Sequence, residues 1–180
     1  MKKRVLCLLA EGFEEIETVT PVDLLRRAGA DVVLAALGGD SLVAGRCGIV
    51  LRADAPLADL DPSAFDLLLI PGGPAVKVMR ADGRPATLAK EFAAAGKLLG
   101  AICAAPLVLH DAGLLTGRRY TAHDSSYGEL TEARAEERVV EDGHIITSRG
   151  AGTALDFGLA LVRHLFGAEK AREVAKAIMA

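Results

Sequence analysis

The stretch LLGAICAAPLVLHDAG, Leu98–Gly113, joins a short apolar run to a leucine-rich segment with helical spacing, and a single cysteine, Cys103, lies at the junction. Continuous apolar runs of this length are typical of strands buried inside a parallel sheet. The stretch therefore predicts a β-strand, a sharp turn and a helix, which is the repeating unit of an α/β protein. The small residues on both sides of Cys103 permit such a turn, as glycines do around the serine of a nucleophile elbow.

The rest of the chain repeats this alternation of short apolar runs and helical patterns. Strands are expected at Arg4–Leu9, Asp31–Leu37, Asp66–Ile70, Lys97–Ile102, Arg118–Ala122, Arg138–Val140 and His144–Thr147, the last two as a hairpin around Asp142 and Gly143. Helices are expected at Glu15–Arg27, Pro85–Ala95, Thr153–Phe166 and Ala168–Met179. Because Leu67–Ile70 is apolar at every position, we expect a sheet covered on both faces. We predict one α/β domain over residues 1–180, a doubly wound, mainly parallel sheet sandwiched by helices.

The composition is that of an ordinary globular protein, with 51% apolar and 25% charged residues. A formal net charge of −3 gives no support for binding nucleic acid or an anionic membrane. No apolar stretch approaches the roughly 20 residues that span a bilayer, and acidic residues follow the first apolar run where a signal peptide would be cleaved. Three cysteines without CxxC spacing predict neither a disulfide framework nor a zinc site. We expect a protein of the reducing cytoplasm.

In open α/β sheets the functional crevice lies beyond the carboxyl ends of the strands. Three segments of this chain occupy that position: Ala10–Glu17, the PGGP sequence Pro71–Pro74, and Cys103. PGGP alone is typical of a turn. Beside a nucleophile, the N–H groups of its glycines could bind a developing oxyanion, with the N–H of Ala104 as a second donor. We therefore expect these segments to meet at one edge of the sheet.

Cys103 has two interpretations from its position alone, namely packing among alanines or nucleophilic chemistry. At the start of a helix, the dipole would lower the pKa of its thiol and favour the thiolate. We assign Cys7 and Cys47 to packing or to incidental exposure.

Two kinds of side chain could assist the thiol. Four acidic residues fall within Glu11–Glu17, and most of them are expected to cap the helix or to be solvated. One that turned inward would be kept protonated by burial and could donate to the thiolate. His123 follows the expected strand Arg118–Ala122, and a Cys–His pair is the usual way to activate a thiol.

Four motifs in order along the chain carry a family resemblance: GFEEIETVTP at Gly12–Pro21, PGGP at Pro71–Pro74, GAICAAP at Gly100–Pro106 and TSRGAGT at Thr147–Thr153. Together they resemble the DJ-1/PfpI (ThiJ) superfamily, and within it the DJ-1/YajL branch. The resemblance covers nearly the whole chain and implies a flavodoxin-like fold, which agrees with the pattern of strands and helices. Ala151 stands where some relatives carry proline, and either Arg46 or Cys47 would take the place of a pocket arginine.

The resemblance also implies roles for individual residues. Cys103 would be the nucleophile, Glu17 its acidic partner, and His123 a histidine near the thiol. The backbone donors would be Gly72, Gly73 and Ala104, and the surrounding or dimer-side pocket would include Glu14, Arg27, Arg149 and Gly150. A homodimer is expected, and no cofactor or metal.

The function that the resemblance implies is cofactor-independent chemistry on reactive 2-oxoaldehydes, in defence against carbonyl and oxidative stress. The reaction would be the glyoxalase conversion of methylglyoxal into lactate, or the removal of early glycation adducts, with Glu17 or His123 as proton acceptor. A second hypothesis is a redox-sensing, chaperone-like stress protein whose Cys103 is oxidised to sulfinate. Cysteine peptidase activity ranks third, because no separate substrate groove is recognisable.

Overall fold

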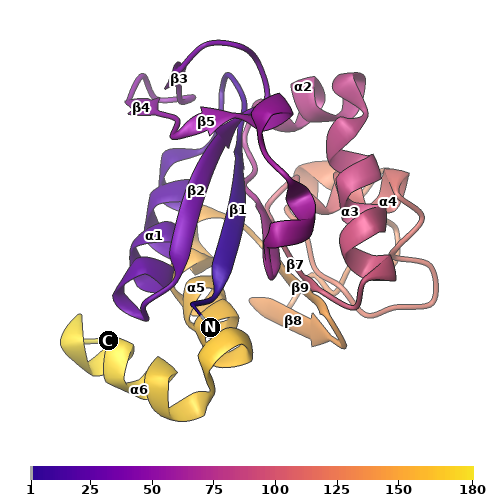
Figure 1. Cartoon of the computed structure of the whole chain (residues 1–180). Coiled ribbons are helices and arrows are strands. Elements are labelled where there is room, and N and C mark those ends of the chain that lie inside the picture. The colour runs from indigo at the N-terminus through magenta and orange to yellow at the C-terminus, as the bar shows by residue number, and fades with distance from the viewer. Residues whose placement is uncertain (1) are drawn as a thin grey trace.

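The computed structural model of the chain describes residues 2–180. Seven strands form one sheet in the order β5-β2-β1-β6-β7-β9-β8, and only the pair β8 and β9 is antiparallel (Figure 1). The strands are β1 (Arg4–Leu9), β2 (Asp31–Ala36), β5 (Ala55–Pro56), β6 (Leu67–Ile70), β7 (Leu98–Ile102), β8 (Val139–Asp142) and β9 (Ile145–Ser148). The predicted doubly wound, mainly parallel α/β architecture is confirmed.

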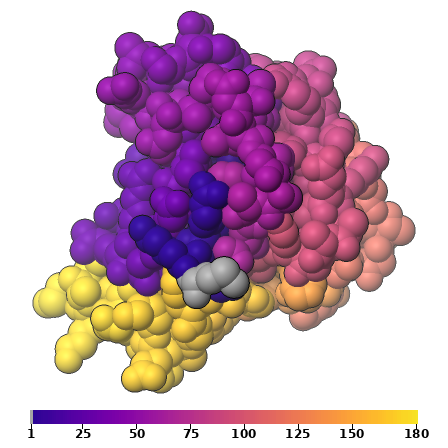
Figure 2. All heavy atoms as spheres, viewed as in Figure 1, coloured from indigo at the N-terminus to yellow at the C-terminus, as the bar shows by residue number. Residues whose placement is uncertain are grey.

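Helices cover both faces of this sheet (Figure 1). They are α1 (Glu15–Arg27), α2 (Ala75–Asp82), α3 (Arg84–Ala94), α4 (Pro106–Asp111), α5 (Ala154–Phe166) and α6 (Ala168–Ala177). On one side α1 packs against α5, and on the other α3 packs against β6, β7 and α4. The C-terminal helix α6 lies at the surface beside the N-terminal segment (Figure 2).

Two glycines allow the layers on the α5 side to approach closely. A Cβ on Gly100 in β7 would lie 3.0 Å from a methyl carbon of Leu161 in α5, and a Cβ on Gly158 in α5 would lie 2.5 Å from Leu24 in α1. Because both positions lack a side chain, α5 can pack between the sheet and α1. At the centre of the sheet the strands are buried, as every residue of Leu67–Ile70 and Leu98–Ile102 shows.

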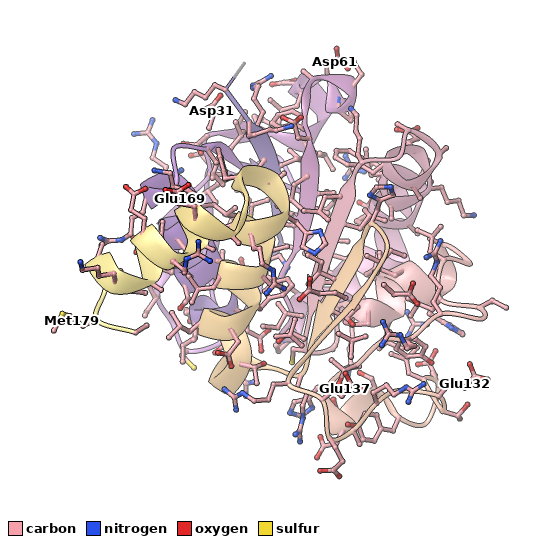
Figure 3. All side chains as sticks on the ribbon, turned by 90° about the horizontal axis from the view of Figure 1, so that it is seen from below. Asp31, Asp61, Glu132, Glu137, Glu169 and Met179 are labelled. Carbon is pink, nitrogen blue, oxygen red and sulfur yellow. The ribbon has the colours of Figure 1, made fainter. Side chains whose placement is uncertain are left out.

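The acidic side chains that give the chain its net negative charge are dispersed. Asp31, Asp61, Glu132, Glu137 and Glu169 lie around the periphery of the molecule instead of in one patch (Figure 3). Among residues 2–180, no helix is long and apolar enough to cross a bilayer.

One predicted strand is wrong. Arg118–Ala122 forms no ladder, because two of its N–H groups donate to side chains of the β8–β9 hairpin instead of to a neighbouring strand. The N–H of Thr121 donates to the hydroxyl of Thr147 at 2.9 Å, and the N–H of Arg119 donates to the carboxylate of Asp142 at 2.8 Å. The segment is extended, but it belongs to a long irregular connection between α4 and β8.

The structure also contains elements that the pattern did not predict. These are α2, β5 and a separate antiparallel hairpin of β3 (Leu42–Ala44) and β4 (Val50–Arg52). The hairpin stands at the carboxyl edge of the main sheet, where Phe13 forms a bridge with Gly45 (Figure 1). It therefore brings residues 45–49 to the end of the sheet at which α1 begins.

Candidate active site

The backbone of Cys103 is held in an unusual conformation. It has φ of +67°, and among residues 2–180 only Met179 shares a positive φ with it outside the glycines. This left-handed conformation costs a non-glycine residue of the order of 1 kcal/mol and persists where the surroundings enforce it. The N–H of Cys103 donates to the carbonyl of Ser148 at 2.9 Å, and its own carbonyl accepts from the N–H of His123 at 2.9 Å. Both backbone groups are therefore fixed, and the half-buried thiol projects from the turn.

Glu17 is the acid that reaches this thiol. It lies in the first turn of α1 with 1% of its surface exposed, and its Oε2 accepts from the N–H of Gly72 at 3.0 Å. Its carboxyl group lies beside Cys103, since a Cβ on Gly72 would touch both Oε2 of Glu17 and the Cβ of Cys103, and the two acids shift each other's pKa. The structure thus selects one carboxyl group among four neighbouring acids.

The other acids of this segment have separate partners. Glu14 caps α1, accepting from the N–H of Glu17 at 2.8 Å, while the exposed Glu11 accepts from Ala44 at 3.3 Å. Glu15 is buried and turns toward the β3–β4 hairpin, where Oε1 accepts from the N–H of Cys47 at 2.7 Å. The amino end of α1 therefore links the thiol to the hairpin.

The PGGP sequence is a close-contact element and not merely a turn. A Cβ on Gly72 would lie 2.4 Å from Oε2 of Glu17 and 2.6 Å from the Cβ of Cys103. Gly73 has φ of +86°, and a Cβ there would lie 2.6 Å from the carbonyl of Gly12. The N–H groups of Gly73 and Ala104 lie close enough to the sulfur to act against the rise of its pKa, whereas the N–H of Gly72 donates to Glu17. Of the three predicted donors, Gly73 and Ala104 therefore face the sulfur.

The ionisation of the thiol differs from the sequence-based expectation. Burial and the negative charge of Glu17 raise the pKa of Cys103 to about 12, against the opposing N–H groups of Gly73 and Ala104. Helix α4, which was expected to lower this pKa, has only six residues. Its small dipole does not offset the burial and the adjacent carboxylate.

Burial also raises the pKa of Glu17, to about 7, although the adjacent thiol of Cys103 acts in the opposite direction. Because two touching acids resist carrying two negative charges, they titrate as a pair. The pair carries one negative charge above neutral pH, and a thiolate forms at Cys103 when Glu17 holds the remaining proton.

His123 lies at the rim of the site. Its Nδ1 is 2.9 Å from the hydroxyl of Ser125 and 2.9 Å from a carboxylate oxygen of Asp124, so its own loop orients the ring. Within the described residues, no hydrogen bond joins this ring to the thiol of Cys103. The contact between the two residues runs through the backbone, and the predicted catalytic role of His123 stays a prediction.

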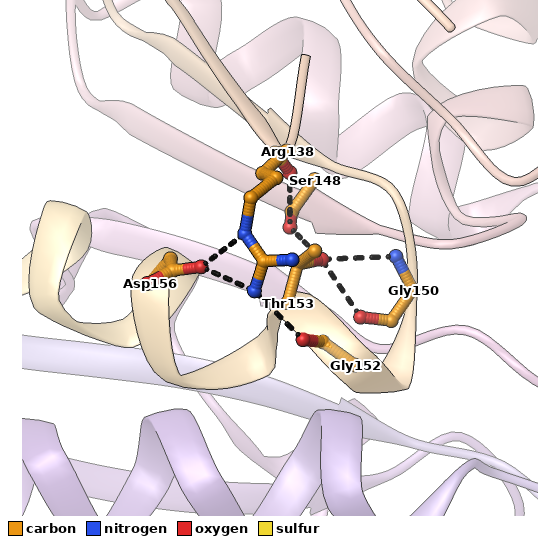
Figure 4. Close-up of polar contacts among 6 residues, drawn as sticks. All are labelled: Arg138, Ser148, Gly150, Gly152, Thr153 and Asp156. Atoms are coloured by element: carbon orange, nitrogen blue, oxygen red, sulfur yellow. Dashed lines mark hydrogen bonds and ion pairs between the residues drawn. The ribbon is translucent and has the colours of Figure 1, made fainter. Parts of the chain in front are cut away.

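The turn after β9 forms one wall of the site. A Cβ on Gly150 would lie 3.4 Å from the ring of His123 and 3.8 Å from Oε1 of Glu17. The hydroxyl of Thr153 holds this turn, donating to the carbonyl of Gly150 at 2.8 Å and lying 2.6 Å from the hydroxyl of Ser148 (Figure 4). Arg138 supports the same turn from outside, through the carbonyl of Gly152 at 2.9 Å and through Asp156 (Figure 4).

The two predicted pocket arginines differ in position. Arg27 lies at the far end of α1 and pairs with Asp23 at 2.6 Å. Arg149 is exposed in the turn after β9, directly after Ser148, whose carbonyl accepts from the N–H of Cys103. Arg46, from the hairpin that the pattern missed, lies close enough to Glu17 to act against the rise of its pKa. Its neighbour Cys47 instead binds Glu15, so Arg46 supplies the positive charge on this side of the site.

The arrangement defines a class of protein. An α/β sheet presents a cysteine on a strained strand-to-helix turn, with a buried carboxyl group and two backbone donors at the sulfur. Among residues 2–180, no group of three or more metal-ligating side chains is arranged to hold a metal ion. The groups gathered at the sulfur are those that thiol chemistry uses, namely an acid and backbone donors.

The chain belongs to the DJ-1/PfpI family, whose model matches residues 3–164. It is 37% identical to the protein dj-1beta of Drosophila melanogaster over 183 residues, covering 99% of this chain and 98% of the relative. The crystal structure of that fly protein matches with a TM-score of 0.95. The structure of Toxoplasma gondii DJ-1, in an oxidised form, matches with a TM-score of 0.92 at 34% identity over 98% of both chains.

A longer relative shows that the domain also occurs within larger chains. The DJ-1 homolog B of Arabidopsis thaliana is 38% identical over 179 residues, which are 98% of this chain and 41% of that protein. The family membership supports the resemblance that the four motifs indicated, and it agrees with the fold.

Proposed function

We propose that this protein is a cofactor-independent, cysteine-dependent enzyme that acts on reactive 2-oxoaldehydes or their early glycation adducts. The observation that carries the proposal is the contact between Cys103 and Glu17 at a strained turn, with the N–H groups of Gly73 and Ala104 directed at the sulfur. Burial keeps the Glu17 proton available near neutral pH. A thiol and an acid that share one proton suit reversible addition to an aldehyde.

In the proposed glyoxalase reaction, the Cys103 sulfur adds to the aldehyde carbon of methylglyoxal. As the bond forms, negative charge develops on the carbonyl oxygen, and the N–H groups of Gly73 and Ala104 stabilise that charge. The oxygen then takes a proton from Glu17, which gives a hemithioacetal. A base then removes the proton from this carbon, and a proton is returned to the adjacent ketone carbon. The ketone becomes an alcohol and the first carbon a thioester, which water hydrolyses to lactate and the free thiol.

The base in this reaction is Glu17 or His123. The contact with the sulfur favours Glu17, because the ring of His123 is held by Ser125 and Asp124. The whole reaction consumes one water and needs no external oxidant or reductant, since the two carbons exchange oxidation levels.

The test is lactate formation from methylglyoxal by the purified wild type and by Cys103→Ser, Glu17→Gln and the control Cys47→Ser. Loss of a positioned acid-base group typically costs about 10²- to 10⁴-fold, so we expect the first two variants to lose activity and the control to keep it. Lactate formation by the wild type no faster than by Cys103→Ser would refute the enzymatic proposal.

A second candidate function is redox sensing by a chaperone-like stress protein. The same groups that face the thiol could hold a sulfinate, with Glu17 as hydrogen-bond donor and Gly73 and Ala104 as further donors. The oxidised form of the Toxoplasma relative supports this candidate. Treating the reduced protein with peroxide and locating the two added oxygens by mass spectrometry tests it, and their absence from Cys103 would exclude it.

A cysteine peptidase ranks third. One relative, YraA of Bacillus subtilis, is 39% identical over 152 residues and carries a name that assigns it provisionally to the cysteine proteases. However, the two largest surface cavities described here, of about 470 and 680 Å³, lie beside α5–α6 and α3 and not at Cys103. Neither of these two cavities would place a peptide substrate at the thiol.

The proposal includes a homodimer and a cytoplasmic location. Apolar side chains are exposed on α1 (Ile16 and Val19) and on the neighbouring hairpin segment (Ile49 and Val50), and a second copy could cover them. Arg27, at the far end of α1, and the exposed Arg149 would then serve the dimer-side pocket. Light scattering tests the dimer, and a free Cys103 thiol requires a reducing compartment.

A further inference from the structure

Arg80 in α2 joins two carboxylates that lie far apart in the sequence. Its guanidinium donates to Asp111 at the end of α4 through Nε and Nη2, at 2.7 and 2.8 Å. It also donates to Glu129 through Nη1 and Nη2, at 2.9 and 2.7 Å. The side chains of Arg80 and Asp111 are 28% and 30% exposed and that of Glu129 is 53% exposed, so the strength of the cluster comes from its paired geometry and not from burial. Two bidentate contacts on one planar group give a geometry that lysine cannot reproduce.

The three elements joined by Arg80 are those that carry the thiol site. Helix α2 begins directly after the PGGP sequence, and α4 begins two residues after Ala104. Glu129 belongs to the irregular connection that contains His123. This connection has no strand ladder of its own, and the contact of Glu129 with Arg80 ties it to α2.

A continuous path of backbone hydrogen bonds leads from Glu129 to Cys103. The N–H of Glu129 donates to the carbonyl of Ser126 at 3.1 Å, and the N–H of Ser126 donates to the carbonyl of His123 at 2.9 Å. The N–H of His123 in turn donates to the carbonyl of Cys103 at 2.9 Å. The side chain of Ser126 adds nothing to this path, since its buried hydroxyl has no hydrogen-bond partner among the described residues.

We propose that Arg80 is a positioning residue for the reactive thiol: through Glu129 it holds segment 123–130, and through that segment the backbone of Cys103. The inference rests on the proposed role of Cys103 as the reacting group. Arg80 touches neither the thiol nor Glu17, and it acts by keeping the strained turn in the conformation that directs Gly73 and Ala104 at the sulfur.

The test compares Arg80→Met and Glu129→Gln with Arg84→Met. Arg84 is a matched control, because it also forms a short ion pair, with Asp82 at 2.7 Å, but has no contact with segment 123–130. Native-state amide hydrogen exchange is measured for segment 123–130 and for β1 as a reference. We expect both test variants to raise exchange at His123 and Ser126 by roughly fivefold, with β1 unchanged.

The second measurement is the pH profile of Cys103 alkylation by a neutral reagent such as iodoacetamide. Looser donors at the sulfur should displace the profile to higher pH by roughly half a unit, which is about threefold in the thiolate fraction. A merely structural ion pair would lower thermal stability without moving this profile, as expected for Arg84→Met.

The inference is overturned if Arg80→Met leaves exchange in segment 123–130 at the wild-type value, or raises it only in proportion to β1. It is also overturned if the alkylation profile does not move, or moves equally in Arg84→Met. These readouts do not require lactate formation. A wild type without turnover would therefore refute the proposed function while the exchange and alkylation results still decide the role of Arg80.

Discussion

Glu17→Gln should make the protein more resistant to rising pH than the wild type. Burial raises the pKa of Glu17 from 4.5 to about 7 in the folded protein. A group that binds its proton more tightly when folded stabilises the fold fully below its unfolded pKa, and this contribution is lost as the pH rises through the folded pKa. The wild type therefore loses stability between pH 4.5 and about 7 from this group.

The size of this loss follows from the two pKa values. Their difference corresponds to about 3 kcal/mol once Glu17 is fully ionised, and no reduction for solvent screening applies because its side chain is only 1% exposed. Glutamine does not titrate. Its amide oxygen can still accept from Gly72, and its amide N–H can still reach the sulfur, so the packing should survive.

The assay is urea unfolding at several pH values between about 4.5 and 8, in a Cys103→Ser background so that no thiol titrates beside position 17. Glu11→Gln is the control, because Glu11 lies in the same segment but is exposed. As the pH rises over this range, we expect the free energy of unfolding of Glu17→Gln to increase by about 3 kcal/mol relative to that of its parent. The free energy of unfolding of Glu11→Gln should change with pH as the parent's does. Parallel curves for Glu17→Gln and its parent would refute the assignment of a raised pKa to Glu17.

Three further predictions follow from the same contacts. In the presence of Cys103, Glu17→Gln should lower the pKa of the thiol, because it removes the carboxylate charge that helps to raise this pKa to about 12. Ultraviolet titration of the thiolate measures the change. A higher pKa in the variant would contradict this and would mean that the carboxyl proton donates to a thiolate in the wild type. Gly72→Ala should separate Glu17 from Cys103, because its Cβ would lie within 2.4 Å of the former and 2.6 Å of the latter; an unchanged pH profile of Cys103 alkylation would contradict this. Cys7 is completely buried, with burial raising its pKa to about 12, and should be alkylated only on unfolding; labelling of the native protein at Cys7 would show that β1 opens locally.

The sequence alone was sufficient for the architecture and for the order of the site segments. Strands such as Leu67–Ile70 are recognisable because a parallel strand covered on both faces must be apolar at every position. The carboxyl ends of parallel strands meet at one edge, so Ala10–Glu17, PGGP and Cys103 could be placed together without coordinates. Local signals failed for Arg118–Ala122, since an extended segment looks the same whether its N–H groups meet a strand or, as here, the side chains of Thr147 and Asp142.

Only the tertiary structure decided which groups reach the sulfur and what charge they carry. Four acids lie within seven residues, and rotation around the first turn of α1 directs Glu17 inward, Glu14 to the cap and Glu15 to the hairpin. The hairpin that brings Arg46 close to Glu17 depends on pairing between β3 and β4. The proton balance between Glu17 and Cys103 depends on burial, which is a property of the whole packed chain and not of neighbouring residues in the sequence. For that reason the motifs predicted where the thiol lies, while its ionisation required the fold.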